Sequence, residues 1–165
     1  MRGARTGHAC RQIHFFGCLT WETVPRWDID SRFDIAENAG ILGFLRRTMP
    51  SAHSDVAAAL IRSADGIGGV HHYCPGPARY AFVVLHLSDF SIFGLAYGQT
   101  RLAYRLPGDR IAQALGEGGS RAPELGPRWV LLEPWSDNEP LHQSRQRLAR
   151  WCTIAAGSVP GMDAS

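Results

Sequence analysis

The sequence of 165 residues contains no lysine, so all seventeen of its basic residues are arginine. Chemistry that needs a lysine amine is therefore excluded, including Schiff-base catalysis and phosphate binding by a P-loop lysine. Alanine, glycine and proline are abundant, as is typical of a bacterial protein from a GC-rich genome. The formal net charge is only +2, so the chain as a whole has little electrostatic attraction for nucleic acid.

Cysteine and long apolar runs are also scarce. The four cysteines are Cys10, Cys18, Cys74 and Cys152; none forms a C-x-x-C pair, and so few do not build a disulfide framework. No stretch approaches the ~20 apolar residues of a membrane span, and the N-terminus lacks the small-residue cleavage site of a signal peptide. We therefore expect a cytoplasmic protein with reduced thiols and no membrane contact.

The composition is that of a globular protein, with 45% hydrophobic and 19% charged residues. A chain of this length fits one domain over residues 1–165 and is long enough to bury a substantial core. We expect residues 1–10 to form a loose leader and residues 157–165 a frayed tail.

Hydrophobic periodicity predicts an α+β fold, with a small antiparallel sheet and helices packed on one face. Alternating apolar and polar positions indicate strands, and apolar positions three and four residues apart indicate helices. Gly66, Gly68 and Gly69 predict a helix stop, which puts His71 and His72 in a turn region. The predicted elements, in chain order, are a strand from Ile13 to about Pro25, a helix after Ser31, a helix capped by Ser54, a strand over 80–89, a hairpin over 93–106 with Gly98 at its tip, a helix after Pro107, a strand over 128–135 and a helix over 141–156.

The hairpin has two different faces. Leu102 and Tyr104 fall on one face, and Arg101 and Arg105 on the other, which we expect to be exposed. Because arginine can hold phosphate through two hydrogen bonds, the hairpin and the closing helix together could engage nucleic acid or another partner. The predicted binding residues are Arg101, Arg105, Arg145, Arg147 and Arg150.

Histidine and cysteine form two clusters with the composition of metal sites. The first holds His8, Cys10, His14 and Cys18; on the predicted strand, His14 and Cys18 lie ~13 Å apart, too far for one zinc ion. The second, His71–Cys74, could join Cys18 in a zinc or copper site only if another element closes on it. We therefore predict no metal and no cofactor.

Other candidate residues are aromatic. Trp21 and Trp135 lie near the ends of predicted elements, where a pocket or a partner surface can use them, and His71 and His72 are assigned to the same kind of site. His86 lies in an apolar strand and is expected to be a hydrogen-bonded core histidine. No nucleophile and base stand together, so no catalytic residue is predicted.

The segment from Asp89 to Ala156 resembles the MmcQ/YjbR-like family and, more distantly, the N-terminal domain of TfoX. The similar pieces are FGLAYG, TRLAYRLP, DRIAQALGEGG, PRWVLLEPW and LHQSRQRLARWCTIAA, in that order. They cover under half of the chain, and Arg105 stands nearest to the position where the family often has lysine. The resemblance implies an α+β fold, a cytoplasmic location, and binding of DNA or a protein partner rather than catalysis.

These observations favour a non-enzymatic binding or interaction module, with another protein or a second copy of the chain as its expected partner. The first alternative is a DNA-binding protein that uses the arginine-lined hairpin and the C-terminal helix. The second is a metal- or Cys/His-dependent enzyme.

Overall fold

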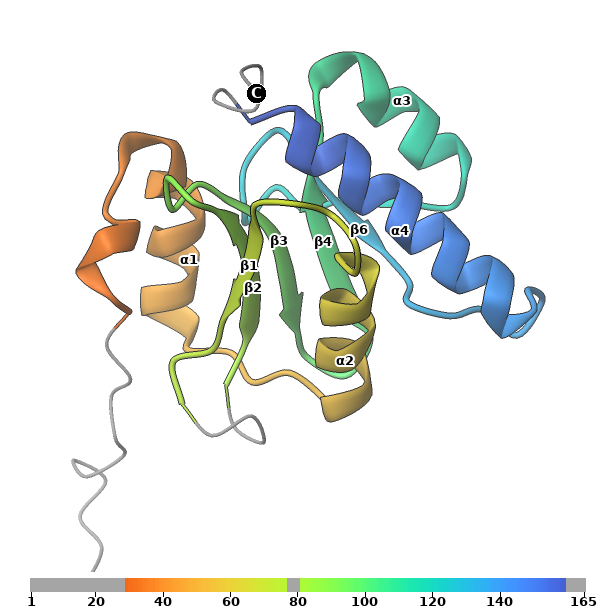
Figure 1. The fold of residues 1–165 in the computed structure, drawn as a ribbon, viewed down its shortest axis with the longest axis horizontal. Helices are drawn as coiled ribbons and strands as arrows, with labels where there is room; N and C mark the ends of the chain where they lie inside the picture. Colours follow the sequence, from red (N-terminus) through yellow and green to blue (C-terminus); the bar gives the residue numbers. More distant parts are fainter. Residues whose placement is uncertain (1–28, 77–80, 160–165) are drawn as a thin grey trace, which may run out of the picture.

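The computed structural model describes residues 29–76 and 81–159, and within them six strands form one antiparallel sheet (Figure 1). The strand order is β1-β2-β3-β4-β6-β5, so neighbours in the sheet follow one another in the chain except for β4 and β6. The strands are β1 (Val70–Tyr73), β2 (Val83–Leu87), β3 (Ile92–Tyr97), β4 (Arg101–Arg105), β5 (Ser120–Arg121) and β6 (Trp129–Leu132).

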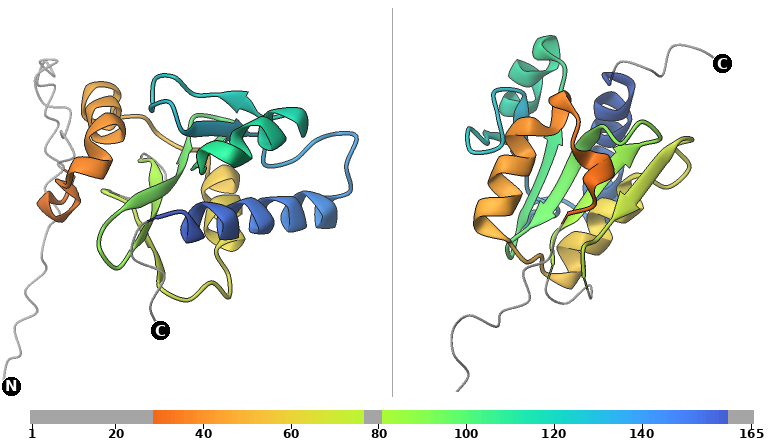
Figure 2. Two further views of the ribbon diagram at one scale, coloured as in Figure 1. Left: turned by 90° about the horizontal axis from the view of Figure 1, so that it is seen from above. Right: turned by 90° about the vertical axis from the view of Figure 1, so that its left-hand side faces the viewer.

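Helices cover both faces of this sheet. Figures 1 and 2 show α1 on one side, and α2 and α4 together on the other. The short helix α3 follows β4 and contacts β5 and β6. The helical elements are the 3-10 turns η2 (Ser31–Phe33) and η3 (Ala36–Asn38) and the α-helices α1 (Ala39–Thr48), α2 (Ser54–Ser63), α3 (Gly108–Gly116) and α4 (Leu141–Gly157).

Alternation along the strands separates two hydrophobic cores, because successive side chains point to opposite faces of a sheet. On the side that we call the α1 face, Val84 and Leu95 pack with Leu45 of α1. On the α2–α4 face, Leu85 packs with Trp151 of α4 in the other core. The antiparallel α+β class is confirmed. The expectation that helices pack on one face is wrong, because α1 covers the second face.

The β3–β4 hairpin forms where the alternation predicts it. Gly98 sits in its turn with a φ of 66°, a left-handed conformation that glycine adopts readily. Tyr104 faces the α2–α4 core and Ala103 the α1 core, as the period of two requires. Arg105 shares the face of Ala103, and its side chain reaches the backbone of Glu37. It is only 9% exposed, so the expectation of an exposed arginine face is wrong at this residue.

The starts of the first two α-helices differ from those that the sequence indicates. Two 3-10 turns occupy residues 31–38, and α1 starts only at Ala39. The N-cap of α2 is His53, whose ring nitrogen accepts a hydrogen bond from the Asp55 amide, rather than Ser54. Helices α3 and α4 match their predicted positions.

The remaining differences lie at an edge strand and at the tail. Residues 70–73 pair with β2 and form the edge strand β1, where a turn was expected. Val159 is buried in the α2–α4 core, although it belongs to the predicted frayed tail. The leader over 1–10 and the strand predicted from Ile13 lie outside the described residues. Among the helices that the structure describes, none is long and apolar enough to cross a membrane.

Candidate functional site: a pocket between α2 and α4

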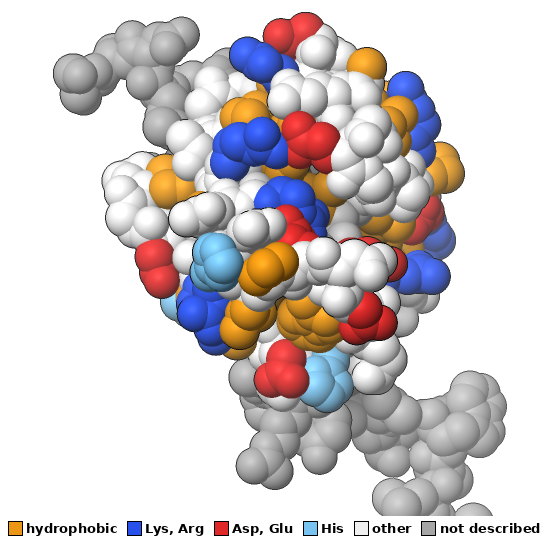
Figure 3. Space-filling view, turned by 90° about the vertical axis from the view of Figure 1, so that its right-hand side faces the viewer, with side chains coloured by type: hydrophobic (Ala, Val, Ile, Leu, Met, Phe, Trp, Pro, Cys, Tyr) orange, Lys and Arg blue, Asp and Glu red, His pale blue; other side chains and the backbone are white. Residues whose placement is uncertain are grey.

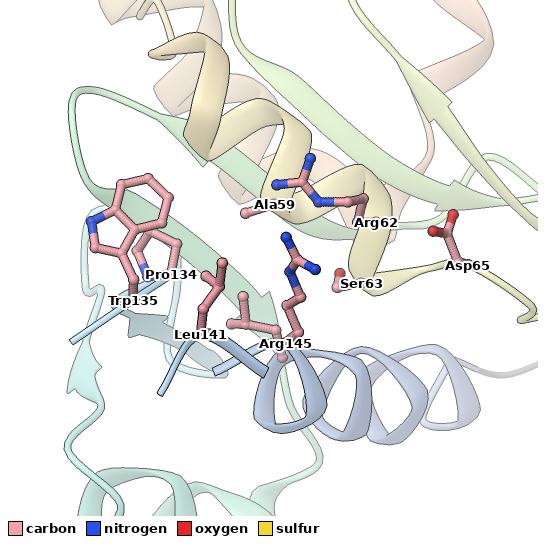
Figure 4. A pocket seen from close by; sticks show the side chains of 9 residues that line it. Ala59, Arg62, Ser63, Asp65, Pro134, Trp135, Leu141 and Arg145 are labelled. Atoms are coloured by element: carbon pink, nitrogen blue, oxygen red, sulfur yellow. The ribbon is translucent and has the colours of Figure 1, made fainter. Parts of the chain in front are cut away.

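A cavity of about 230 Å³ opens where α2, the loop over residues 133–140 and the first half of α4 meet (Figure 4). We call it the α2–α4 pocket. Its apolar lining comes from Ala59, Pro134, Trp135, Leu141 and Leu148, and its polar lining from Arg62, Ser63, Asp65 and Arg145. The pocket therefore combines an apolar wall with two guanidinium groups.

The apolar wall includes the two most conspicuous hydrophobic side chains of the surface. Trp135 is 38% exposed and Leu141 is 56% exposed, and within the described ranges no other large hydrophobic residue is exposed. Exposed apolar side chains gathered at one place on a surface mark sites of ligand or partner contact. Trp135, predicted as a pocket or interface residue, does line a pocket.

The charged lining consists of Arg62, in the last turn of α2, Asp65, just after that helix, and Arg145, near the start of α4. Figure 4 shows both guanidinium groups directed into the space between the two helices. Neither arginine takes part in an ion pair with any residue that the structure describes. Two cationic groups thus line one opening, and neither pairs with Asp65 or with another residue of the described ranges.

The loop that carries Trp135 is fixed to α4 by one carboxylate. Glu139 accepts a hydrogen bond from the Ser144 hydroxyl at 2.8 Å and another from Nη2 of Arg147 at 3.1 Å. The same Nη2 also donates to the carbonyl oxygen of Glu133 at 3.0 Å. The bonds from Arg147 first, and then from Ser144, lower the pKa of Glu139. The pocket wall is therefore held in place before any ligand arrives.

A buried hydrogen-bond chain lies behind the pocket. The Tyr104 hydroxyl donates to Oγ of Ser63 at 2.6 Å, and Ser63 donates to the carbonyl oxygen of Leu60, also at 2.6 Å. Burial raises the pKa of Tyr104 well above its ordinary value and raises that of the nearby Cys152 thiol to about 11. Both groups are neutral at physiological pH, so neither is activated as a nucleophile or a base.

The five arginines predicted to bind a partner do not form one surface. Arg105 is buried, with Nη1 3.1 Å from the carbonyl oxygen of Glu37. Arg147 pairs with Glu139, and Arg150 pairs with Glu117. On the face seen in Figure 3, basic, acidic and apolar side chains are interspersed rather than grouped by charge.

The two arginines that remain are Arg101 and Arg145. Arg101 lies over the ring of Tyr97, with its guanidinium carbon 5.6 Å from the ring centroid. Arg145 lines the α2–α4 pocket. Of the predicted set, Arg145 alone belongs to the site described here.

The histidine and cysteine candidates diverge. His71 and His72 are successive residues of β1, so their side chains point to opposite faces of the sheet. Cys74 donates to the carbonyl oxygen of Gly76 at 3.1 Å instead of joining them. Among residues 29–76 and 81–159, no three His, Cys, Asp or Glu side chains are placed to hold a metal ion. His8, Cys10, His14, Cys18 and Trp21 lie outside the described residues.

His86 is a hydrogen-bonded core histidine, as predicted. It is 8% exposed, and its Nδ1 donates to the carbonyl oxygen of Leu87 at 2.8 Å. Its ring stacks on Phe90 and lies 5.6 Å from the ring of His71, measured between centroids. Burial lowers the pKa of His86, which keeps the imidazole neutral.

Sequence reasoning missed Arg62 and Leu141 as site residues. Both fit ordinary helical roles, an arginine in a last helical turn and an apolar residue at a helix start. Only the packing of α2 against α4 brings them together, and these helices are separated in the chain by the whole sheet.

No family model, curated protein or solved structure matches this chain. The similarity to MmcQ/YjbR-like proteins stays a prediction, and so does any DNA-binding role that it implies.

Proposed function

We propose that this protein is a non-enzymatic binding module that takes its ligand or partner in the α2–α4 pocket. The observation that carries the proposal is that exposed apolar side chains and cationic side chains lie together in one cavity. The same cavity is lined by the exposed side chains of Trp135 and Leu141 and by the guanidiniums of Arg62 and Arg145, which form no ion pair within residues 29–76 and 81–159. Tryptophan and arginine are the residues most enriched where binding energy concentrates.

The polar groups of this pocket are suited to binding a ligand rather than to catalysing a reaction. A serine nucleophile needs a neighbouring base that takes its proton. The hydroxyl of Ser63 is instead 4% exposed and hydrogen-bonded to Leu60 and Tyr104. Because burial raises the pKa of Tyr104, the phenol cannot serve as that base near neutral pH. The remaining polar groups, two guanidiniums and the Asp65 carboxylate, suit recognition.

A fragment titration tests this proposal. The protein, labelled with 15N, is titrated with indole, phenol, benzoate and benzylamine while its backbone and indole N–H resonances are recorded. We expect at least one fragment to shift the Trp135 indole signal together with the amides of Ser63 and Leu148, because these groups border the cavity.

Two variants locate the binding. Trp135→Ala should abolish the shifts at Ser63 and Leu148, since it removes most of the apolar wall. The matched control is Phe90→Ala, which removes an aromatic side chain from the α1 face and should leave those shifts unchanged. The proposal fails if every fragment leaves the pocket resonances unmoved, or if Trp135→Ala has no effect on them.

A further inference from the structure

The charge of the pocket lining limits which ligands it can bind. Arg62 and Arg145 contribute two positive charges and Asp65 one negative charge, which leaves a formal charge of +1. Arg62 lies in the last turn of α2, where the free carbonyl groups of the helix add a partial negative charge. The site is therefore suited to a singly charged anion, and less suited to a dianion such as a phosphate monoester.

The geometry of the two arginines also indicates an anion. The guanidiniums come from facing helices and point into the same opening (Figure 4). Like charges held in this way repel each other, and an anion between them removes the repulsion. A planar guanidinium matches a planar carboxylate, with two parallel N–H donors for two oxygens.

The apolar part of the pocket indicates that the ligand also carries an apolar group next to its negative charge. Trp135, Leu141 and Leu148 form a wall next to the guanidiniums rather than apart from them. The cavity of about 230 Å³ lies below the range of ~300–1,000 Å³ typical for drug-sized ligands. It has room for one apolar group of side-chain size beside the charged group.

We infer that the ligand of the α2–α4 pocket is a carboxylate that carries one apolar side group, with the carboxylate between Arg62 and Arg145 and the apolar group against Trp135 and Leu141. This inference rests on the proposed binding function and gives it a ligand class. A free N-acylated amino acid has this chemistry, and so does the C-terminal residue of a protein chain.

The test compares probes that differ in one feature. N-acetyl-L-leucine and N-acetyl-L-leucinamide have the same apolar group, and only the first is an anion. We expect the acid to bind at least about tenfold more tightly than the amide at low ionic strength, as judged by shifts at the Trp135 indole and the Ser63 amide. Phenyl phosphate, offered as a dianion, should bind more weakly than the acid.

Each other result has a defined meaning. If acid and amide bind equally well at the pocket, the ligand class is wrong and the binding function stands. If phenyl phosphate binds more tightly than the acid, the inference of a single negative charge is wrong. If no probe shifts the pocket resonances, the inference and the proposed function both fail.

A tetrapeptide, Ala-Ala-Ala-Leu, distinguishes the two sources of such a carboxylate. Tighter binding than N-acetyl-L-leucine, lost when the peptide carries a C-terminal amide, identifies a protein C-terminus as the ligand. Tighter binding of N-acetyl-L-leucine identifies a small free acid. Both results support the carboxylate assignment.

Variants assign the contact to the two arginines. Arg62→Gln and Arg145→Gln should each weaken binding of the acid by about tenfold and leave binding of the amide unchanged. Arg62→Lys and Arg145→Lys should also weaken it, because an ammonium group cannot form the two-pronged contact. Arg110→Gln, on α3 outside the pocket lining, is the matched control and should bind the acid as the parent protein does. Unchanged affinity in both glutamine variants would overturn the assignment.

Discussion

The two faces of the sheet use polar side chains in different ways. On the α1 face, Asn38 is fully buried and makes three hydrogen bonds of 2.9 Å, to the carbonyl oxygens of Phe33 and Phe90 and from the amide of Ile92. At the rim of the α2–α4 face, Arg62 and Arg145 have no ion-pair partner among the residues described.

The comparison shows that residue type alone does not reveal a role. Arg105 and Arg145 are both arginines that the sequence assigns to one binding surface. The first is buried against the backbone of Glu37, while the second lines a cavity. A polar group with all its partners inside the fold stabilises the fold, and one that lacks them at a pocket is available to a ligand.

The largest effect on stability is expected at Asn38. Asn38→Ala leaves the buried amide of Ile92 and the carbonyl oxygen of Phe90 without their partners, while the carbonyl oxygen of Phe33 still accepts from the amide of Ile35. The free energy of unfolding should therefore fall by about 2–4 kcal/mol. Urea denaturation measures the change. Asn138→Ala, an exposed position in the pocket loop, is the control and should change stability by less than ~0.5 kcal/mol. A loss as small for Asn38 as for Asn138 would contradict the structural role assigned to the α1 face.

Tyr104 tests whether the α2–α4 face also has a polar interior. Tyr104→Phe removes the donor to Ser63 without opening a cavity, and should reduce stability by about 1–2 kcal/mol. Tyr73→Phe is the control, because the Tyr73 hydroxyl makes a longer, 3.3 Å contact in a partly exposed place. Equal losses of stability in the two variants would argue against a special role for the buried hydrogen bonds from Tyr104 to Ser63 and from Ser63 to Leu60.

His86 makes the stability of the α1 face depend on pH. Its pKa in the folded protein is lowered, mainly by burial, from the ordinary value of 6.5. The unfolded chain therefore binds the proton more readily, so stability is full above about pH 7 and falls as the pH drops through ~6.5 toward the folded pKa. His71, Arg32 and His72 oppose the charged form as well.

A His86→Phe variant should lose this pH dependence and keep the stacking on Phe90. The measurement is the difference in unfolding free energy between pH 7.5 and pH 5.0, expected to be smaller in the variant than in the parent protein. His142→Gln, at an exposed position of α4 that does not contribute to the shift of His86, should keep the parent dependence. If the unfolding free energy of His86→Phe changes with pH as much as that of the parent protein, another titratable group causes the pH dependence.

The smallest effect on stability is expected at the pocket itself. Arg62→Gln and Arg145→Gln should each change the unfolding free energy by less than ~0.5 kcal/mol, because neither guanidinium forms an ion pair in the part of the chain that the structure describes. Arg147→Gln, two residues further along α4, should cost about 1 kcal/mol through its lost bonds to Glu139 and Glu133. Large losses at Arg62 or Arg145 would assign these residues to the fold rather than to a ligand.

The sequence predicted where helices and strands lie along the chain better than it predicted which of them pack against each other. Strand and helix periods placed the β3–β4 hairpin, β6, α3 and α4 because the pattern of side chains along one element is local. The burial of Arg105 depends on its contact with Glu37 of η3, which lies more than sixty residues earlier in the chain. No local pattern contains that information.

The pocket, too, depends on contacts between elements that local sequence patterns do not contain. Trp135 and Arg145 were selected from the sequence for separate reasons, an aromatic near a strand end and a basic helix face. The structure brings them into one cavity and adds Arg62 from α2. Predicting this third residue requires knowing that α2 packs against α4, which is a property of the complete fold.

The separation of α2 and α4 in the chain has a consequence for synthesis. At rates of ~5–20 residues per second, Arg62 is made several seconds before Arg145, and the whole sheet is made in between. Throughout that interval the apolar side of α2 lacks the helix that covers it, and the cavity does not exist. Binding of the proposed ligand therefore reports that α4 has packed onto α2, and a nascent chain that ends before α4 cannot capture the ligand.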